Sequence, residues 1–369
     1  MQHRLRSAVL LVLVVGLGPS AESGDKKNKP YSELPIVKKE DPEEITQALP
    51  PAKEPPAAVT AETGTLVFST LPLSSKGLLS QQTREAVRLL LHNNRSGTVV
   101  KLRAFVAGSG DVRRVQEIVS EVFGEKRQTL PALTVVQVGA LPLEGAQVSI
   151  EAVVAGKKES NPNGLGFFSA QSGASLGEAS LKLGNAFAKA GLAASNALRV
   201  TCYVNSLDAA GDPRRHLSAF SSAAVTVVQM LREPVGPNAA CEAVAQLRAP
   251  AEPPVKFVAG DDGQAVAVFV SVPSVALTSL QMAFGRQKED IRQGYDRLNK
   301  ALATVHASFA DIVAADTYLL FGSVAQTAGE VRAEFSGHSS PPATMILPFQ
   351  GLPSLDATLG IEAVAVPHS

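Results

Sequence analysis

The chain has 369 residues, of which 45% are hydrophobic and 18% are charged, so it is long enough to bury two or three hydrophobic cores. It carries 34 acidic and 34 basic residues, and only 5% of its residues are aromatic. Nucleic-acid binding relies on clustered positive charge and on stacking rings, so this composition predicts no nucleic-acid partner.

The first 23 residues have the features of a secretion signal. The basic start MQHRLR precedes the apolar run AVLLVLVVGL, and small residues follow at Ala21 and Ser23. The run is too short to cross a bilayer, which takes about 20 residues. We predict a signal peptide over 1–23, export to a periplasmic or extracellular location, and no stable membrane insertion after cleavage. An uncleaved membrane anchor is the alternative.

Residues 24–63 form a proline-rich segment. The segment contains seven prolines and one aromatic residue. A stretch that is so polar and so often interrupted by proline does not build a core, so we predict a solvated, disordered tether.

The rest of the chain contains an internal repeat. Residues 130–154 align without a gap to residues 341–365 at an offset of 211, and GPNAACEAVAQL between them is a weaker third copy. The unit starts also align, as TLVFS at 65–69, LGFFS at 165–169 and VAVFVS at 266–271. The pattern predicts three units, over 64–157, 163–258 and 264–369, of which the second is divergent.

The first unit shows the expected order of elements most clearly. A strand at 65–69 precedes a helix in SQQTREAVRLLLHNN, for which Ser80 is a candidate N-cap. The alternating, β-branched stretch TVVKLRAFVA predicts a strand. Asp111 then begins a second helix, and two strands follow on either side of Leu141-Pro142.

The other two units repeat this order. Ser175 and Glu178 form a capping box before one helix, and ALRVTCYV is the following strand. Asp212-Pro213 is expected to open a helix that carries Leu217, Phe220, Ala224 and Val228 on one face. In the third unit, helices are expected near 278–304 and 323–335, with the strand DIVAADTYLLF between them.

Each unit is therefore an α+β unit of the order β-β-α-β-α-β-β, in which two helices cover one face of a sheet. The strands are apolar at nearly every position, as is typical of strands that are covered on both faces. Packing the three open sheet faces inward would remove them from water, at about 25 cal/mol per Å² of apolar surface. We expect an intramolecular pseudo-trimer with sheets at the centre and helices outside.

The first unit resembles the Rid family, the YjgF-type reactive-intermediate deaminases, in its order of elements and in the runs QQTREAV, EVFGE, LPALTVVQVGALP and VSIEAVV. The third unit is similar through EFSGHSSPPAT and GIEAVAV, and the second mainly through PNAACEAVAQL. Members of this family are small subunits that form trimers with a central sheet barrel and a ligand cleft at each boundary. The resemblance implies that this chain is a monomer that contains its own trimer.

Rid deaminases hydrolyse 2-enamines and 2-imines derived from amino acids, and an arginine in the closing motif holds the substrate carboxylate. The resemblance places Leu133, Ala239 and Thr344 at this position, so the arginine is missing from all three units. It also matches Cys241 to a cleft cysteine and Gln116 to a cleft asparagine. Losing two charge-assisted hydrogen bonds predicts at least a hundredfold weaker capture of a carboxylate.

Glu151 and Glu362 match the acidic residue of the family's I-E-A-V motif, and the second unit was expected to lack it. A glutamate in an apolar stretch has a raised pKa and can serve as a general acid or base. The alternative is a structural carboxylate that is hydrogen-bonded to neighbouring groups.

Cys202 and Cys241 are expected to be two buried thiols, although a disulfide is permitted outside the cytoplasm. The six histidines show no metal-ligand spacing and no C-x-x-C pair occurs, so the sequence predicts no metal and no cofactor.

Three functions follow from these observations. The first is an exported Rid-like protein that has lost its deaminase chemistry and binds a small molecule or a partner at the clefts between units. The second is an imine deaminase that holds its substrate through another cation, such as Arg103 or Arg199. The third is a structural or interaction scaffold.

Overall fold

The computed structural model describes residues 58–62, 66–156, 164–231, 238–247, 255–259, 265–270, 274–336 and 342–367. All of them belong to one compact unit, Lys53–Ser369. The predicted signal peptide and residues 24–57 of the predicted tether lie outside the described residues. Among those that are described, no helix is long and apolar enough to span a membrane.

The first unit forms a four-stranded sheet in the order β2-β5-β3-β4, with two helices on one face. Its elements are β2 (Leu66–Thr70), α1 (Leu79–Asn93), β3 (Thr98–Ala107), α2 (Val112–Glu125), β4 (Ala132–Val138) and β5 (Val148–Ala155). Asp111 caps α2 as predicted, because its carboxylate accepts from the backbone N–H groups of Arg113 and Arg114. Helix α1 begins after Leu78 and not after Ser80.

The second unit forms a sheet in the order β11-β12-β6-β10-β8-β9. Its elements are β6 (Leu165–Phe168), β7 (Gln171–Gly173), α3 (Leu176–Lys189), η1 (Ala194–Asn196), β8 (Ala197–Val204), α4 (Leu207–Ala210), α5 (Pro213–His216), η2 (Ser218–Phe220), β9 (Ala224–Gln229), β10 (Ala239–Gln246), β11 (Val255–Ala259) and β12 (Ala265–Val270). The helix predicted after Asp212 is only one turn long. Ala224 and Val228 lie in strand β9, where β-branched neighbours favour an extended chain.

The third unit forms a sheet in the order β1-β13-β17-β15-β16. Its elements are β13 (Ser274–Thr278), β14 (Gln281–Phe284), α6 (Lys288–Ala303), η3 (Phe309–Asp311), β15 (Ile312–Leu319), α7 (Val324–Ser336), β16 (Ala343–Pro348) and β17 (Ala357–Ala365). Strand β1 (Ala58–Glu62) joins this sheet from the other end of the chain, by antiparallel pairing with β13.

The structure differs from the predicted unit boundaries at two points. Residues 58–62, which were assigned to the tether, form strand β1. The run VAVFVS, which was aligned with the start of the third unit, contains β12, and β12 pairs with β6 of the second sheet. Both strands are short and apolar, and a sequence pattern alone does not show which sheet edge such a strand joins.

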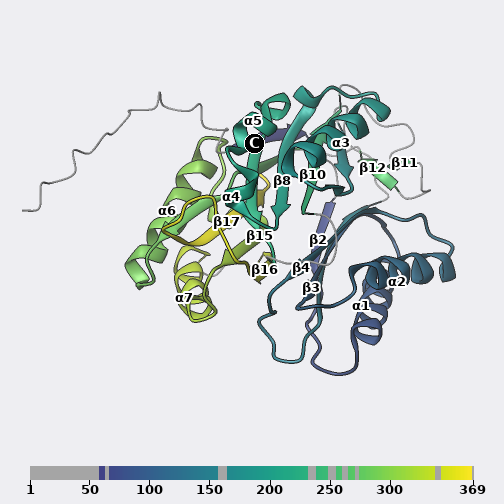
Figure 1. The fold of residues 1–369 in the computed structure, drawn as a ribbon, viewed down its shortest axis with the longest axis horizontal. Coiled ribbons are helices and arrows are strands. Elements are labelled where there is room, and N and C mark those ends of the chain that lie inside the picture. Colours follow the sequence, from purple (N-terminus) through teal and green to yellow (C-terminus); the bar gives the residue numbers. More distant parts are fainter. Residues whose placement is uncertain are drawn as a thin grey trace, which may run out of the picture. The chain divides into compact units, whose positions relative to one another are not determined.

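The three sheets turn their helix-free faces toward one another. One apolar cluster joins residues of all three sheets, namely Val100, Leu165, Leu198, Val275 and Val364, and a second contains Phe105, Tyr203, Tyr318 and Phe349. Figure 1 shows α1 and α2 beside the first sheet and α6 and α7 beside the third, on the outer sides. The α+β class and the three repeated units are thus confirmed.

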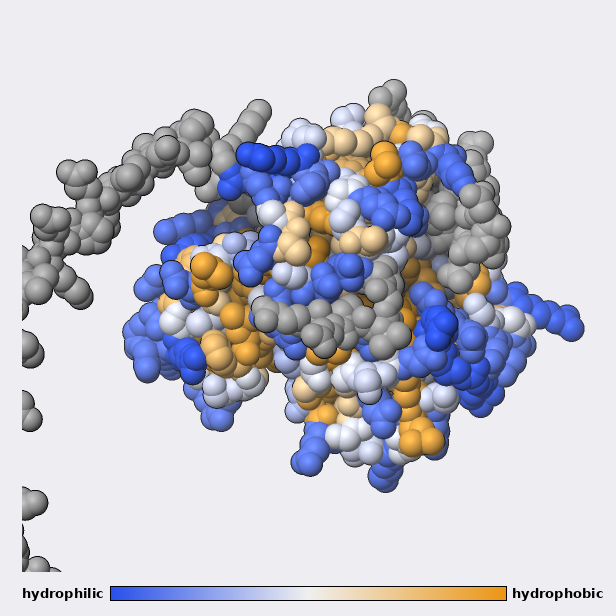
Figure 2. All heavy atoms as spheres, viewed as in Figure 1, coloured by the Kyte–Doolittle hydropathy of each residue, from blue (hydrophilic) through white to orange (hydrophobic). Residues whose placement is uncertain are grey.

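Strand pairing does not close the sheets into one barrel. Within the described residues, the sheets stay separate, and an isolated bridge between Gln229 and Gly351 links the second and third units. The outward helix faces are polar. Figure 2 shows hydrophilic residues gathered over α1 and α2, where Arg84 pairs with Glu121 and Arg88 pairs with Glu125.

Candidate functional site

A layer of charged and polar side chains lies between the two apolar clusters that join the sheets. Three pairs of residues face each other at equivalent positions of the strand register: Arg103 and Glu151, Thr201 and Glu242, and Asp316 and Glu362. Two residues earlier on β3, β8 and β15 stand Lys101, Arg199 and Ala314. We call the eight polar residues of these two sets the central layer. Every one of them lines one cavity.

Glu242 is the most strongly compensated carboxylate of the central layer. Its Oε2 lies 2.5 Å from Lys101 Nζ and accepts a hydrogen bond from Thr134, and its Oε1 accepts one from Tyr203 at 3.2 Å. Lys101 also donates to the carbonyl of Phe168 at 2.7 Å. Burial raises the pKa of Glu242, but Lys101 and Arg103 outweigh this effect and lower it to about 2. Glu242 is therefore ionised in the folded protein.

Arg103 connects all three units. Its guanidinium pairs with Glu151 of its own unit, donates to Asp316 at 2.6 Å and to the Tyr203 hydroxyl at 3.3 Å, and lies 3.6 Å from Glu242. Burial lowers the pKa of Arg103, but Asp316 and Glu151 raise it well above its usual value. The guanidinium thus already pairs with carboxylates of the protein, so it is not available to hold a substrate carboxylate.

Glu362 is fully buried and has the same kinds of partner as Glu242. Its Oε2 accepts from Thr226 at 2.5 Å and its Oε1 accepts from Tyr318 at 3.0 Å. Arg199 occupies the position equivalent to Lys101, but its Nη1 stays 3.9 Å from Glu362. Burial raises the pKa of Glu362, and the distant Arg199 offsets this only in part.

Glu151 lacks the partners that the other two glutamates have. The residues equivalent to the cation, the threonine and the tyrosine are Ala314, Met345 and Phe105. Burial raises the pKa of Glu151 well above its usual value, Arg103 opposes this, and the neighbouring carboxyl group of Asp316 reinforces it. Compared with an exposed glutamate, the neutral form of Glu151 is therefore favoured.

The cavity in the central layer has a volume of about 60 Å³. An apolar cavity that holds a benzene molecule measures about 150 Å³, so this cavity suits a smaller solute. Besides the central layer, its walls include Val244, Leu277, Ala343 and Val364. The cavity therefore suits a very small polar molecule and does not suit an amino-acid-derived imine.

The structure brings together two of the residues that were singled out in the sequence, Glu151 and Glu362, which both line the cavity. Leu133 and Thr344 lie on the edge strands β4 and β16, and neither lines it. Gln116 lies half-buried on α2, also away from the cavity.

The placement of Ala239 and Cys241 is corrected by the strand register. Both lie on β10, the closing strand, and not on the edge strand where the carboxylate clamp was expected. The edge strand of the second unit is β9, and its Val225 pairs with Val200 as Leu133 pairs with Leu102. Leu133, Val225 and Thr344 thus occupy equivalent positions on the edge strands of the three units, and none of them is an arginine.

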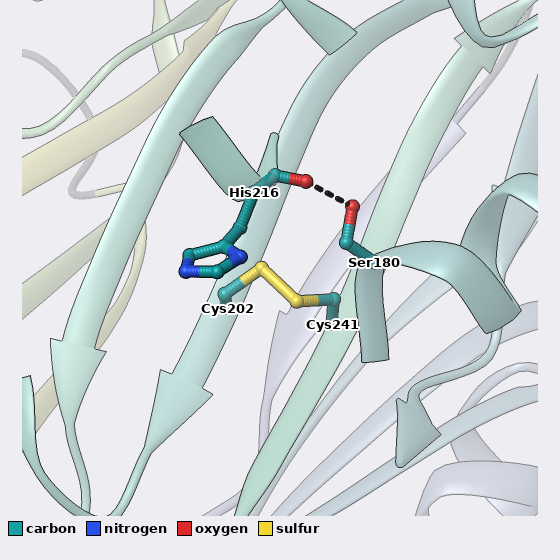
Figure 3. The surroundings of a disulfide bond; sticks show 4 residues. All are labelled: Ser180, Cys202, His216 and Cys241. Carbon is teal, nitrogen blue, oxygen red and sulfur yellow. Dashed lines mark hydrogen bonds between the residues drawn. A yellow bond between two sulfur atoms is a disulfide. The ribbon is translucent and has the colours of Figure 1, made fainter. Parts of the chain in front are cut away.

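The expectation of two free thiols is wrong, because Cys202 and Cys241 form a disulfide. They are directly opposite each other on β8 and β10, with their Cα atoms 4.1 Å apart. Both are buried beneath α3, and Figure 3 shows the bond near Ser180 and His216. The Ser180 hydroxyl donates to the backbone carbonyl of His216 and not to its ring, so the two residues form no nucleophile-and-base pair.

Lys101, Glu242 and Asp316 were not predicted from the sequence as site residues. Lys101 shares the mostly apolar strand β3 with Arg103, and Asp316 lies in the mostly apolar strand β15; a charge in such a strand marks a buried pairing partner. The run CEAV around Glu242 repeats the I-E-A-V pattern, so the second unit does carry the glutamate that it was expected to lack. This repeat was not recognised because β10 of the second unit had been aligned with the edge strand of the first unit.

Comparisons with known proteins agree with this architecture. Residues 58–156 match the Endoribonuclease L-PSP family. A YjgF-family protein of Mycobacterium tuberculosis is 25% identical over 25% of this chain and 78% of its own, with a TM-score of 0.24. Yeast Mmf1 is 22% identical over 26% of this chain and 80% of its own, with a TM-score of 0.24.

A chorismatase is similar over most of the chain. It is 13% identical, covers 82% of this chain and 99% of its own, and has a TM-score of 0.50, so the likeness concerns the fold alone. None of the curated proteins that were compared matches the chain.

The fold and the central layer define a protein in which three α+β units of one chain enclose a shared polar centre. Residues 58–156 thus match the family of the Rid proteins, also called YjgF or L-PSP proteins, and the two later units repeat the same α+β arrangement.

The central carboxylates lead to one prediction about pH. Because the folded-state pKa of Glu242 is lowered to about 2, its stabilising effect is full above the ordinary pKa of about 4.5 and is lost as the pH falls toward 2. Glu242→Gln should therefore cost about 3 kcal/mol at pH 7 and much less near pH 2.

The matched variant is Glu151→Gln. The pKa of Glu151 is raised, so its neutral form stabilises the fold at low pH and this effect is lost as the pH rises through the folded-state pKa. Since an amide mimics the neutral acid, this variant should change stability far less at pH 7. Urea unfolding of both variants between pH 2 and pH 8 checks this, and equal losses at pH 7 would contradict it.

Proposed function

We propose that this chain is an exported Rid-like protein that no longer acts as an imine deaminase and instead binds a small molecule at the boundaries between its units. The observation that carries the proposal is the edge-strand position of the carboxylate clamp, which holds Leu133, Val225 and Thr344. Arginine would supply two charge-assisted hydrogen bonds of about 1.5–3 kcal/mol each, and none of these residues can replace them.

The central cations do not replace the missing clamp. Arg103 and Lys101 are engaged with carboxylates and with a backbone carbonyl. The cavity of about 60 Å³ is also too small for a substrate that contains both a carboxylate and an imine. The disulfide between Cys202 and Cys241 supports the export part of the proposal, since such bonds persist in oxidising compartments.

A deaminase with a different clamp is the competing function, and one observation favours it. Arg199 lines the cavity near Glu362 and makes no close ion pair, so its guanidinium could hold a carboxylate beside a general acid. This reading requires the cavity to enlarge when substrate binds.

The test is keto-acid release from freshly generated 2-aminoacrylate, with and without the protein recovered in its processed, exported form. We expect no acceleration above the spontaneous rate, while a Rid protein that has the arginine serves as the positive control. Acceleration that is lost in Glu362→Gln or Arg199→Gln would establish the competing function. Recovery of the chain only in the cytosol, with residues 1–23 still attached, would refute export.

A further inference from the structure

Arg199 is a buried cation with too few partners. Its side chain is about 90% buried, and the 3.9 Å approach to Glu362 is longer than a hydrogen bond. Among the residues that the structure describes, no other group contacts its guanidinium as an acceptor, although the group has five N–H donors. Within the described residues, its nitrogens are not among the buried side-chain atoms that lack a partner, so they reach the cavity, where water or a small solute can accept from them.

The equivalent residue of the first unit shows what a satisfied cation looks like here. Lys101 has three acceptors within hydrogen-bond distance, namely Glu242, Thr134 and the carbonyl of Phe168. Arg199 occupies the same register position on β8 and also lines the cavity, with Glu362 and Thr226 in the places of Glu242 and Thr134. Its guanidinium stays 3.9 Å from Glu362, so its N–H donors remain available to a small acceptor in the cavity.

Thr201 adds a second donor on the same strand. It is 2% exposed and lines the cavity, and its hydroxyl has no hydrogen-bond partner within the described part of the chain. Arg199 and Thr201 lie two residues apart on β8, so their side chains project from the same face of the sheet. The pair thus offers N–H and O–H donors to one small acceptor.

The charge of the central layer is compatible with an anion. It contains three cations, Lys101, Arg103 and Arg199, and four carboxylates. The pKa values of Glu151 and Glu362 are raised, which reduces the negative charge that an anion beside Arg199 would meet.

We propose that the central cavity binds one small monovalent oxyanion, of the size of formate or acetate, through the guanidinium of Arg199 and the hydroxyl of Thr201. The volume of about 60 Å³ accommodates three or four heavy atoms, and Leu277 and Val364 give the wall an apolar side for a methyl group. Phe68, Val244 and Ala343 of the wall are half-buried, which gives a small solute a way in from solvent. The cavity lies where the three units meet and is not lined by Leu133, Val225 or Thr344, so the proposal holds whether or not that edge-strand position binds a ligand.

The experiment uses the whole processed protein in a buffer free of carboxylates. Titration with formate and with acetate, followed by calorimetry, should show saturable binding of one anion per chain. Crystals soaked in sodium bromide should show an anomalous peak in contact with Arg199. Arg199→Gln should weaken binding at least tenfold, and Thr201→Val should weaken it by a smaller factor. Arg215→Gln, at an exposed arginine, is the matched control and should bind as the unaltered chain does.

Two results would overturn the proposal. One is a cavity that holds only water in bromide-soaked and acetate-soaked crystals. The other is unchanged anion affinity in Arg199→Gln. If that variant does not fold, the anomalous map of the unaltered protein and the affinity of Thr201→Val decide the question.

Discussion

Replacing Arg103 by leucine is expected to lower the free energy of unfolding by about 3–5 kcal/mol, because it leaves buried carboxylates of more than one unit without their shared cation. Glu151, Asp316 and Glu242 all approach this guanidinium, so their carboxyl groups would lose a shared cation at low dielectric. Denaturant unfolding of Arg103→Leu at pH 7 measures the effect.

The control is Arg113→Leu, because the side chain of Arg113 is 81% exposed and its nearest carboxylate is 3.7 Å away. Exposed pairs of this kind contribute roughly 0–1 kcal/mol. The loss in Arg103→Leu should also shrink when Asp316→Leu is added, since one of the stranded charges is then removed. A loss below 1 kcal/mol for Arg103→Leu would show that the central ion pairs do not hold the three units together.

Removing the disulfide should cost about 4 kcal/mol. The bond joins residues that are 39 positions apart, and in the chain-entropy account a loop of that length gives a stabilisation of this size. Replacing both Cys202 and Cys241 by alanine should lower the melting temperature and the denaturant midpoint accordingly. Both sites are fully buried, so the smaller side chains add a cavity cost.

A reductant distinguishes the contribution of the disulfide from the cost of the cavity that the alanine substitutions leave. It should destabilise the unaltered protein and leave the double alanine variant unchanged. The opposite outcome, a midpoint of the unaltered protein that is insensitive to reductant under unfolding conditions, would mean that the bond contributes nothing to stability.

Most of the fold was predicted from the internal repeat. The offset of 211 residues and the apolar strands led to three α+β units with inward-facing sheets, and Asp111 and Ser175 marked true helix starts. These signals are local and periodic, so they can be read along one chain. The sheet to which β1 and β12 belong depends on pairing with distant strands, and no local pattern encodes that choice.

The candidate site was predicted less well. Glu151 and Glu362 were found because they lie in a repeated motif, but Glu242 was missed because the second unit was aligned through the wrong strand. Its short second helix shifts the edge strand to Ala224–Gln229, and only the register shows that Val225 replaces Leu133. The disulfide was missed for a related reason, since facing positions on β8 and β10 follow from the same register.

The surroundings of the three glutamates differ, which is possible because the three units belong to one polypeptide. In a homotrimer, every substitution is imposed three times around the axis, so a change of threonine to methionine or of lysine to alanine would remove all three partners at once. Here Ala314, Met345 and Phe105 alter the surroundings of Glu151 alone, while Glu242 and Glu362 keep theirs. Because the three units belong to one chain, each glutamate can have its own surroundings, and the three sites are electrostatically unequal.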